Sequence, residues 1–356
     1  MSGSFAAYQN RRGALSKNSF AVHDILSGLR KSEGEVSFWM SAADRFTSLA
    51  PDDLSRVASG AELKVDVLSA GGVSSRSRQI KYANGSALDL TELNAHVRAS
   101  GGFDHDGIAL ISATRLSDAT ICGTPIEAAT VLAIPGGVDI TAAIRPGLRY
   151  AAALLPTGLW LEAQAVANGA VQPMPRAPVA IRLNAGRAQD LQASLGRLLD
   201  SVAATTPDDG QPPAALLEHV GLIAEASARA QPEAQLDRSF NRQVRQAWLA
   251  QDFIHAHLDE DLPVMRLCRE VAVSRRQLEY AFRTTFGVAP RDFVQSVRLN
   301  EARRRLMRAR GRGQTITDIA LETGITHLGR FAHVYRRLFG ESPRQTLAGG
   351  GATRPA

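Results

Sequence analysis

Cysteine is scarce in this chain, which has only Cys122 and Cys268 among its 356 residues. Two cysteines do not build a disulfide framework, and without other ligands they cannot form a zinc site. Cys268 lies in a helical pattern at a small-residue position, so we expect it in the core where two helices cross. Cys122 lies in Ile121-Cys-Gly-Thr-Pro125, which is typical of a turn. Neither thiol is expected to be reactive.

Long apolar runs are also missing. No stretch approaches the ~18 uncharged apolar residues that a membrane-spanning helix needs. Residues 1–30 are polar, are interrupted by charges and lack the apolar core of a secretion signal. We therefore expect a cytoplasmic protein without a membrane partner, whose residues 1–30 are weakly ordered.

Motifs for common catalytic chemistry are absent as well. The chain has no Gly-rich phosphate loop, no Gly-x-Ser-x-Gly motif and no paired metal-ligand motif. His96 and His105 have no partner at ligand spacing, so a surface or turn position is expected for both. We expect no catalytic residue, no metal site and no cofactor.

Lysine is missing from residue 236 to the end of the chain. This segment has 21 Arg against 12 Asp and Glu, a net charge of +9, whereas the remainder of the chain has a net charge of −3. A basic segment beside a mildly acidic one indicates a polyanion-binding module next to a module with another task. A solvated arginine-rich surface is the alternative.

Residues 31–185 are predicted to form a β-rich domain. Leu63-Lys-Val-Asp-Val-Leu68 alternates between apolar and polar residues, and residues 107–112 and 129–134 are short apolar runs between turn signals. Many short strands favour a sandwich or barrel. For four basic and aromatic residues, a solvated strand or loop is a simpler interpretation than an anion pocket: Arg76, Arg78, Lys81 and Tyr82.

Residues 186–235 are predicted to be a helical segment between the two modules. Four leucines form one stripe of a helix over 186–204: Leu191, Leu195, Leu198 and Leu199. A second helix is expected over 214–230, after a loop rich in Pro and Asp. The stripe leaves two alternatives open, which are dimerisation or signal passage on the one hand and packing on the β-rich domain on the other.

The basic segment contains an internal repeat. Phe286-Gly-Val-Ala-Pro290 recurs 53 residues later as Phe339-Gly-Glu-Ser-Pro343. In both copies apolar residues spaced by four precede the pentapeptide, as on one face of a helix: Leu278, Phe282 and Phe286, then Phe331, Tyr335 and Phe339. Each copy is predicted to be a short helix, a tight turn and a longer helix.

Capping residues set the ends of these helices. Ser274 with Gln277 forms a capping box at the start of the first long helix, and Thr315 with Asp318 caps the second short helix. Glycines mark the second turn and end the long helices: Gly324, Gly287 and Gly340. Between the copies, residues 292–310 form one connecting helix of very roughly 28 Å. That length is close to the ~34 Å between successive major-groove segments on one face of DNA.

Together these motifs resemble the DNA-binding domain of the AraC/XylS family of bacterial regulators. The matching segments are Val273-Ser-Arg-Arg-Gln-Leu-Glu-Tyr-Ala-Phe-Arg-Thr-Thr-Phe-Gly287, Arg298-Leu-Asn-Glu-Ala-Arg303, Ile319-Ala320 and residues 324–343. His327-Leu-Gly-Arg-Phe331 is similar to the branch that contains the ethanolamine-operon regulator. Ile325 departs from the aromatic residue usual in the family, and only a repacked core is expected there.

The resemblance implies an α+β chain. A cupin-like jelly roll over 31–185 would sense a small-molecule effector, and a helical linker or dimerisation segment over 186–235 would follow. Residues 236–347 would form an all-α DNA-binding domain with two helix-turn-helix units, and 348–356 a flexible tail. The implied partners are double-stranded promoter DNA and RNA polymerase, with a homodimer and the choice between activator and repressor left open.

The resemblance also implies the side chains that read bases. Its base-reading positions fall on Arg276, Glu279 and Tyr280, and Arg276 suits a bidentate contact with guanine. Glu279 has an alternative role as a surface charge paired with Arg275 or Arg283. The full set of candidates is Arg275, Arg276, Gln277, Glu279 and Tyr280 in the first unit, and His327, Leu328, Gly329, Arg330 and His333 in the second. Gly329 allows either close backbone approach or a tight turn.

Further arginines are candidates for phosphate contacts or for simple solvated charge: Arg283, Arg303, Arg304, Arg336, Arg337 and Arg344. A protein that compacts DNA without reading it is the main alternative function, although it would need neither the β-rich domain nor two capped reading units. An enzyme or a DNA-repair protein with an attached DNA-binding domain is a further alternative, and the latter would need a reactive cysteine.

Overall fold

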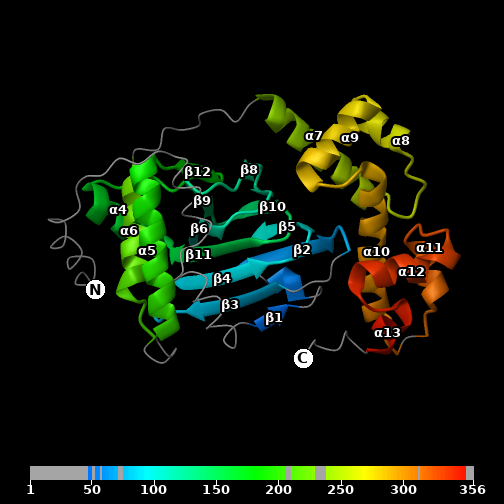
Figure 1. The fold of residues 1–356 in the computed structure, drawn as a ribbon, viewed down its shortest axis with the longest axis horizontal. Helices are drawn as coiled ribbons and strands as arrows, with labels where there is room; N and C mark the ends of the chain where they lie inside the picture. Colours follow the sequence, from blue (N-terminus) through cyan, green and yellow to red (C-terminus); the bar gives the residue numbers. More distant parts are fainter. Residues whose placement is uncertain are drawn as a thin grey trace.

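The computed structural model describes residues 47–49, 53–56, 58–70, 75–204, 210–228, 238–311 and 313–349. Two β-sheets with a layer of helices form the N-terminal half, and helices α7 to α13 form the C-terminal half (Figure 1). This arrangement confirms the α+β class with a β-rich N-terminal part. The expected weak order of residues 1–30 lies outside the described residues, as does the end of the chain from residue 350.

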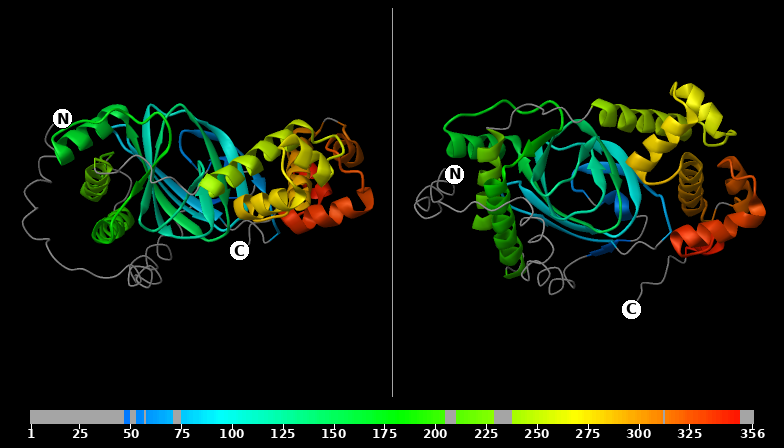
Figure 2. Two further views of the ribbon diagram at one scale, coloured as in Figure 1. Left: turned by 90° about the horizontal axis from the view of Figure 1, so that it is seen from above. Right: turned by 45° about the horizontal axis from the view of Figure 1, so that its top comes forward.

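The two sheets face each other and curve around a common interior (Figure 2). The first has the strand order β1-β3-β4-β11-β6-β9-β12, with bounds Thr47–Leu49, Ser75–Lys81, Ala87–Leu93, Leu148–Pro156, Gly107–Arg115, Thr130–Pro135 and Val179–Arg182. The second has the order β2-β5-β10-β7-β8, with bounds Ala61–Val67, Val97–Phe103, Val138–Ile144, Ala119–Ile121 and Thr124–Pro125. Neighbouring strands pair antiparallel, as β11 does with both β4 and β6.

Strand β4 shows how both faces of the first sheet are covered. Leu88 and Leu90 pack under the helical layer, whereas Ala87 and Leu93 belong to the core between the sheets. All seven residues of the strand are buried because both of its faces are covered. Its polar residues Asp89, Thr91 and Glu92 are buried as well, so the alternation in its sequence does not mark a solvent-exposed face.

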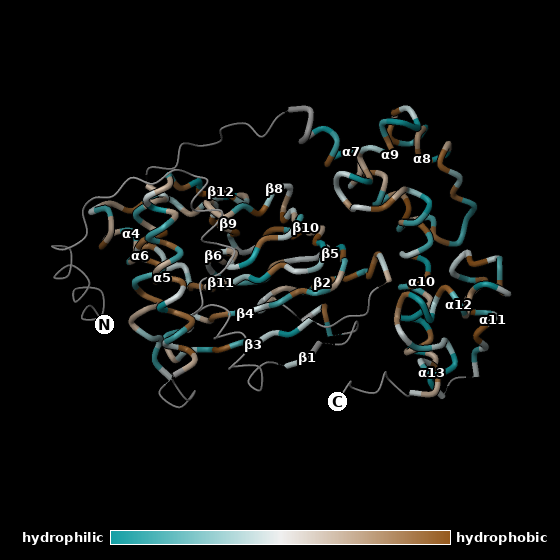
Figure 3. Tube along the Cα trace, viewed as in Figure 1, coloured by the Kyte–Doolittle hydropathy of each residue, from teal (hydrophilic) through white to brown (hydrophobic). Residues whose placement is uncertain are grey.

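Helices α4 (Thr157–Asn168), α5 (Ala185–Ala204) and α6 (Ala214–Ser227) cover the outer face of the first sheet. Hydrophobic and hydrophilic stretches alternate along α5 (Figure 3). The predicted leucine stripe on α5 is buried against this sheet, with exposed fractions of 2% or less for Leu191, Leu195, Leu198 and Leu199. Of the two alternatives for this stripe, the structure shows packing on the β-rich domain. Helix α4 was not predicted, since it follows β11 without a linker.

A buried histidine joins the helical layer to the sheet. On α6, His219 Nε2 lies 3.2 Å from Ser112 Oγ of β6, and its Nδ1 lies 2.8 Å from Ser194 Oγ of α5. Burial lowers the pKa of His219 to about 4, so the ring is neutral at physiological pH. Neutral imidazole can bridge two hydroxyl groups in an otherwise apolar layer at little cost.

The C-terminal half consists of α7 (Arg238–Ala256), α8 (Val264–Glu270), α9 (Arg275–Phe286), α10 (Pro290–Arg308), α11 (Ile316–Glu322), α12 (Leu328–Phe339) and α13 (Pro343–Ala348). Phe282, Phe286 and Phe293 form its first core, with neighbouring ring centroids 4.6–5.4 Å apart. The connecting helix is α10, and its predicted apolar face is buried: Phe293, Val297, Leu299, Ala302 and Leu306. No helix in the described part of the chain is both long and apolar enough to cross a membrane.

Candidate nucleic-acid interface

The first helix-turn-helix unit is built by α8 and α9 on a fully buried apolar seam. Leu267, Leu278 and Phe282 are completely buried between α7, α8 and α9. The predicted capping box is present at the start of α9, because Gln277 N donates to Ser274 Oγ at 3.3 Å and Ser274 N donates to Gln277 Oε1 at 2.9 Å. The cap fixes the first turn of α9 and therefore the direction of the side chains that follow it.

The outer face of α9 carries the residues predicted to read bases. Arg275, Arg276, Gln277 and Tyr280 are exposed, and 57% of Tyr280 is open to solvent. Glu279 accepts a hydrogen bond from Arg275 Nε at 2.9 Å, one helical turn away. This is one of the two roles considered for Glu279, so a contact with cytosine would require the ion pair to open.

The second unit is built by α11 and α12. Thr315 and Asp318 cap α11 as predicted. Gly324 has a φ of +73°, and a Cβ there would lie 2.3 Å from the carbonyl oxygen of Leu258, so the turn requires glycine. The predicted reading residues follow at the start of α12 and are all exposed: His327, Leu328, Gly329, Arg330 and His333.

Gly329 has a different environment from Gly324. It lies inside the first turn of α12 with helical dihedrals, and a Cβ built on it would meet no atom within 4 Å. The fold itself therefore does not require glycine here, which removes the tight turn as its explanation. Ile325 is partly buried against the core, as expected for a repacked position.

Four of the arginines predicted to contact phosphates are exposed on this domain: Arg283, Arg336, Arg337 and Arg344. The prediction is wrong for Arg303, which is buried, forms an ion pair with Glu341 and stacks 4.9 Å from the ring centroid of Phe339. The prediction of a phosphate contact also disagrees with the ion pairs of Arg304, whose guanidinium bonds Asp66 at 2.9 Å and Glu301 at 3.0 Å. A run of three arginines on a helix points in three directions, and two of these directions face protein.

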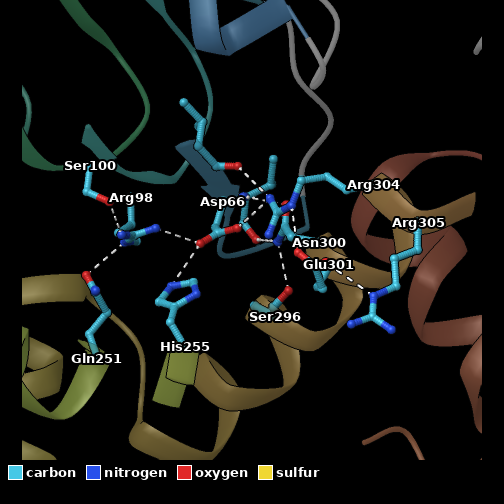
Figure 4. Close-up of polar contacts among 12 residues, drawn as sticks. Asp66, Arg98, Ser100, Gln251, His255, Ser296, Asn300, Glu301, Arg304 and Arg305 are labelled. Carbon is cyan, nitrogen blue, oxygen red and sulfur yellow. Dashed lines mark hydrogen bonds and ion pairs between the residues drawn. The ribbon is translucent and has the colours of Figure 1, made fainter. Parts of the chain in front are cut away.

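The junction between the two halves is a polar contact that the sequence did not reveal (Figure 4). Asp66 of β2 is fully buried between Arg98 Nη1 at 2.8 Å, Arg304 Nη1 at 2.9 Å and His255 Nε2 at 3.3 Å. Burial alone would raise the pKa of Asp66, but the hydrogen bond of His255 and the charges of Arg304 and Arg98 hold it well below the usual range. The carboxylate is therefore ionised and ties α7 and α10 to the sheet.

Helix α10 also bonds directly to the backbone of β2, which is an edge strand. Asn300 accepts from Val67 N at 3.0 Å and donates to Val67 O at 2.8 Å, while Ser296 Oγ donates to Leu68 O at 3.0 Å. The Asn300 amide thus pairs with the edge as a neighbouring strand would. These contacts fix the sheet on the connecting helix of the DNA-binding half.

A third contact reaches the end of α9. His96 Nε2 lies 2.8 Å from the carbonyl oxygen of Phe286, and Arg145 Nη2 donates to the carbonyl oxygen of Arg283 at 3.4 Å. His96 lies in the turn between β4 and β5, as expected, and its half-buried ring contacts the C-terminal half. His105 also lies in a turn, stacked 5.5 Å from Phe103.

The remaining predicted groups have structural partners. Arg76 Nε bonds Glu92 at 2.6 Å and Arg78 donates to Val202 O at 3.3 Å, so they hold strands and helices instead of lining an anion pocket. Cys268 is buried where α8 meets α9, as expected. Among the described residues, no three His, Cys, Asp or Glu side chains are grouped as a metal ion would require.

Comparison with known proteins places similarity on the C-terminal half. A helix-turn-helix domain family matches residues 267–349. The probable thc operon regulatory protein of Rhodococcus erythropolis is 37% identical over 99 residues, and the XylDLEGF operon transcriptional activator of Pseudomonas putida is 36% identical over 95. These matches cover 28% and 27% of this chain and 30% of each relative, so less than a third of those proteins is compared.

Among solved structures, a probable AraC family transcriptional regulator from Rhodopseudomonas palustris is similar at 30% identity, with a TM-score of 0.28. That match covers 30% of this chain and 98% of the other. The match to the helix-turn-helix domain family concerns the segment that carries α8 to α13.

Proposed function

Because the C-terminal domain of this chain belongs to the AraC/XylS family of helix-turn-helix domains, we propose that the protein regulates transcription by binding a bipartite promoter site. The observation that carries the proposal is the pair of helices α9 and α12, each of which exposes cationic and polar side chains. Figure 1 shows the two units at opposite ends of α10. One continuous helix between two reading helices suits two half-sites on one face of DNA.

Within this proposal the exposed side chains divide into two classes. Base edges would be read by Arg275, Arg276, Gln277, Glu279 and Tyr280 in one half-site and by His327, Leu328, Gly329, Arg330 and His333 in the other. Phosphates would be held by Arg283, Arg336, Arg337 and Arg344. Arg276 has the geometry for guanine O6 and N7, and such a bidentate pair contributes about 1–3 kcal/mol of discrimination.

We also propose control by a small-molecule effector at the N-terminal domain. A groove of about 930 Å³ is lined by β2, by β3 and by α10, including Lys64, Gln79, Glu301 and Arg304. A ligand there would touch Arg304, the ion-pair partner of Asp66, and Lys64, which lies two residues from Asp66. RNA polymerase as a partner, and activation of transcription, belong to the same proposal, and light scattering would measure whether the chain forms a homodimer.

The test is binding of the full-length protein to upstream and unrelated duplexes over a range of salt concentrations. A regulator should footprint a defined upstream site, and log K should fall steeply with log salt because each phosphate contact releases condensed counterions. Equal affinity for all duplexes would instead support a DNA-compacting protein. Binding that is insensitive to salt would contradict both functions.

A further inference from the structure

A polar groove of about 750 Å³ runs between α7 and the first reading helix α9. One wall is the first half of α7, with Arg242, Gln243 and Gln246. The other wall is the start of α9, with Ser274, Arg276, Gln277 and Tyr280. Among the described residues that line the groove none is acidic, in contrast to the groove beside β2, which contains Glu62 and Glu301.

Helix α7 has two distinct faces along this groove. Val244, Ala247, Ala250 and Ile254 are buried in the core of the first unit, with exposed fractions of 5% or less. Arg242 is exposed, and Gln246 lies one helical turn further along the same side. The apolar face explains why α7 is present in the fold, but it does not explain a polar, cationic wall beside the reading residues.

We propose that this groove holds the sugar–phosphate backbone of the DNA strand that borders the major groove read by α9, with Arg242 and Gln246 binding phosphate oxygens. The inference rests on the proposed function. A major groove about 12 Å wide admits one helix, whose diameter is about 10–12 Å. A helix packed beside α9 must therefore lie over the backbone, out of reach of the base edges.

The chemistry of the lining fits this occupant. Phosphate and sugar oxygens accept hydrogen bonds from Arg, Gln, Ser and Tyr side chains, and such contacts make up half or more of protein–DNA hydrogen bonds. Arg276 and Tyr280 belong to both the groove and the base-reading face, so the wall formed by α7 would set how deeply α9 enters. In this arrangement Arg242 positions the protein without adding base preference.

Arg242→Ala tests the proposal, and Arg245→Ala is the matched control. Arg245 is exposed on the same helix, one turn away, and does not line the groove. In the full-length protein, Arg242→Ala should weaken binding to the specific and to an unrelated duplex by similar factors. It should also reduce the slope of log K against log salt by about 0.9, the value for one phosphate contact. Arg245→Ala should leave both quantities at the wild-type value.

Phosphate-ethylation interference adds a positional readout. Wild-type protein should show a phosphate at the edge of the first half-site whose ethylation blocks binding, and Arg242→Ala should lose that one signal. Identical slopes and interference patterns for Arg242→Ala, Arg245→Ala and wild type would overturn the groove assignment while the proposed function stands. A loss restricted to one base pair would overturn it too, because Arg242 would then read a base. Absence of specific binding by the wild type would instead be a failure of the proposed function.

Discussion

At the level of single residues, Gly329 connects the stability of α12 to its contact with DNA. The position is helical and open, so the Gly329→Ala variant should raise the free energy of unfolding by about 1 kcal/mol through helix propensity. We expect the same variant to bind DNA more weakly, because a Cβ would occupy the space through which the backbone of α12 approaches the duplex.

Gly196→Ala is the matched control for this substitution. Gly196 lies within α5, a Cβ there also meets no atom within 4 Å, and α5 is on the far side of the sheet from the reading helices. Thermal melts should show stabilisation in both variants, and DNA titration should show weaker binding only for Gly329→Ala. Unchanged affinity of Gly329→Ala would mean that the glycine has no role in close approach.

Asp89 predicts a pH dependence of stability in the β-rich domain. Burial raises its pKa to about 6, despite hydrogen bonds from Ser59 N at 2.6 Å and Ser59 Oγ at 2.7 Å. Because the folded pKa lies above the ordinary value of 3.8, folding favours the protonated carboxyl. Stability should therefore fall as pH rises through the interval from about 4 to about 6, by about 3 kcal/mol as an order of magnitude.

Asp89→Asn should remove this loss, since an amide can accept from Ser59 N and donate to Ser59 Oγ without a charge. Urea unfolding of wild type and variant between pH 4.5 and 7.5 would measure how the stability of each protein depends on pH. The difference between the two unfolding free energies isolates Asp89 from other titrating groups such as His219. Parallel curves would show that the carboxyl does not titrate in this interval.

At the level of elements, α10 should act as a rigid spacer between the two reading helices. Its apolar face is fully buried and the neighbouring helices α9, α11 and α13 pack on it. Inserting about five base pairs between the half-sites rotates one of them by half a turn, so one unit should lose its site. Gel shifts should show a large loss of affinity, whereas the same insertion outside the site should have no effect. Retained affinity would mean that only one unit binds.

The helix ends that could be predicted from the sequence are those fixed by residues close together in the chain. Ser274 caps α9 through Gln277, and Thr315 caps α11 through Asp318, and both pairs are three residues apart in the chain. The burial of Arg303 depends on Glu341, 38 residues away, and that of Arg304 on Asp66, 238 residues away. Composition and periodicity indicate that such arginines are charged, but they do not indicate which protein carboxylate faces them.

At the candidate interface, too, only the features with nearby causes in the chain could be predicted from the sequence. The exposed face of α9 follows from helical periodicity once the core residues Leu278 and Phe282 are placed. The wall that α7 forms beside α9 depends on how these two helices pack against each other. In the chain they are separated by a turn and by α8. His96 has no motif that marks it as a contact to Phe286, because its partner is a backbone carbonyl of another domain. Only the fold brings these groups together.

At the level of the whole molecule, the junction at Asp66 joins the β-rich half to a C-terminal half whose first unit has a core of its own. Leu267, Leu278, Phe282 and Phe293 are fully buried within the C-terminal helices, and the barrel adds only Leu68 and Ala143 to that cluster. The contacts across the junction include the polar groups of Asp66, Asn300 and Ser296, and an apolar cluster that extends from the sheets to Leu299, Ala302 and Leu306 of α10. Polar contacts between domains can be replaced by water more easily than an apolar core can.

The C-terminal fragment 236–347, expressed alone, should therefore fold and recognise the same DNA site as the full-length protein. The fragment contains about 110 residues, a size that folds independently, and the polar partners it loses are replaced by solvent. Because Arg304 is released from Asp66, the fragment should show a salt dependence at least as steep as that of the full chain. What the fragment should lack is any response to an effector, since the groove beside β2 is removed. Titrating candidate metabolites against both proteins on one duplex measures this difference. If a metabolite changes the affinity of the fragment as much as that of the full chain, the N-terminal domain is not the sensor, whereas the assignment of the helix-turn-helix domain is unaffected.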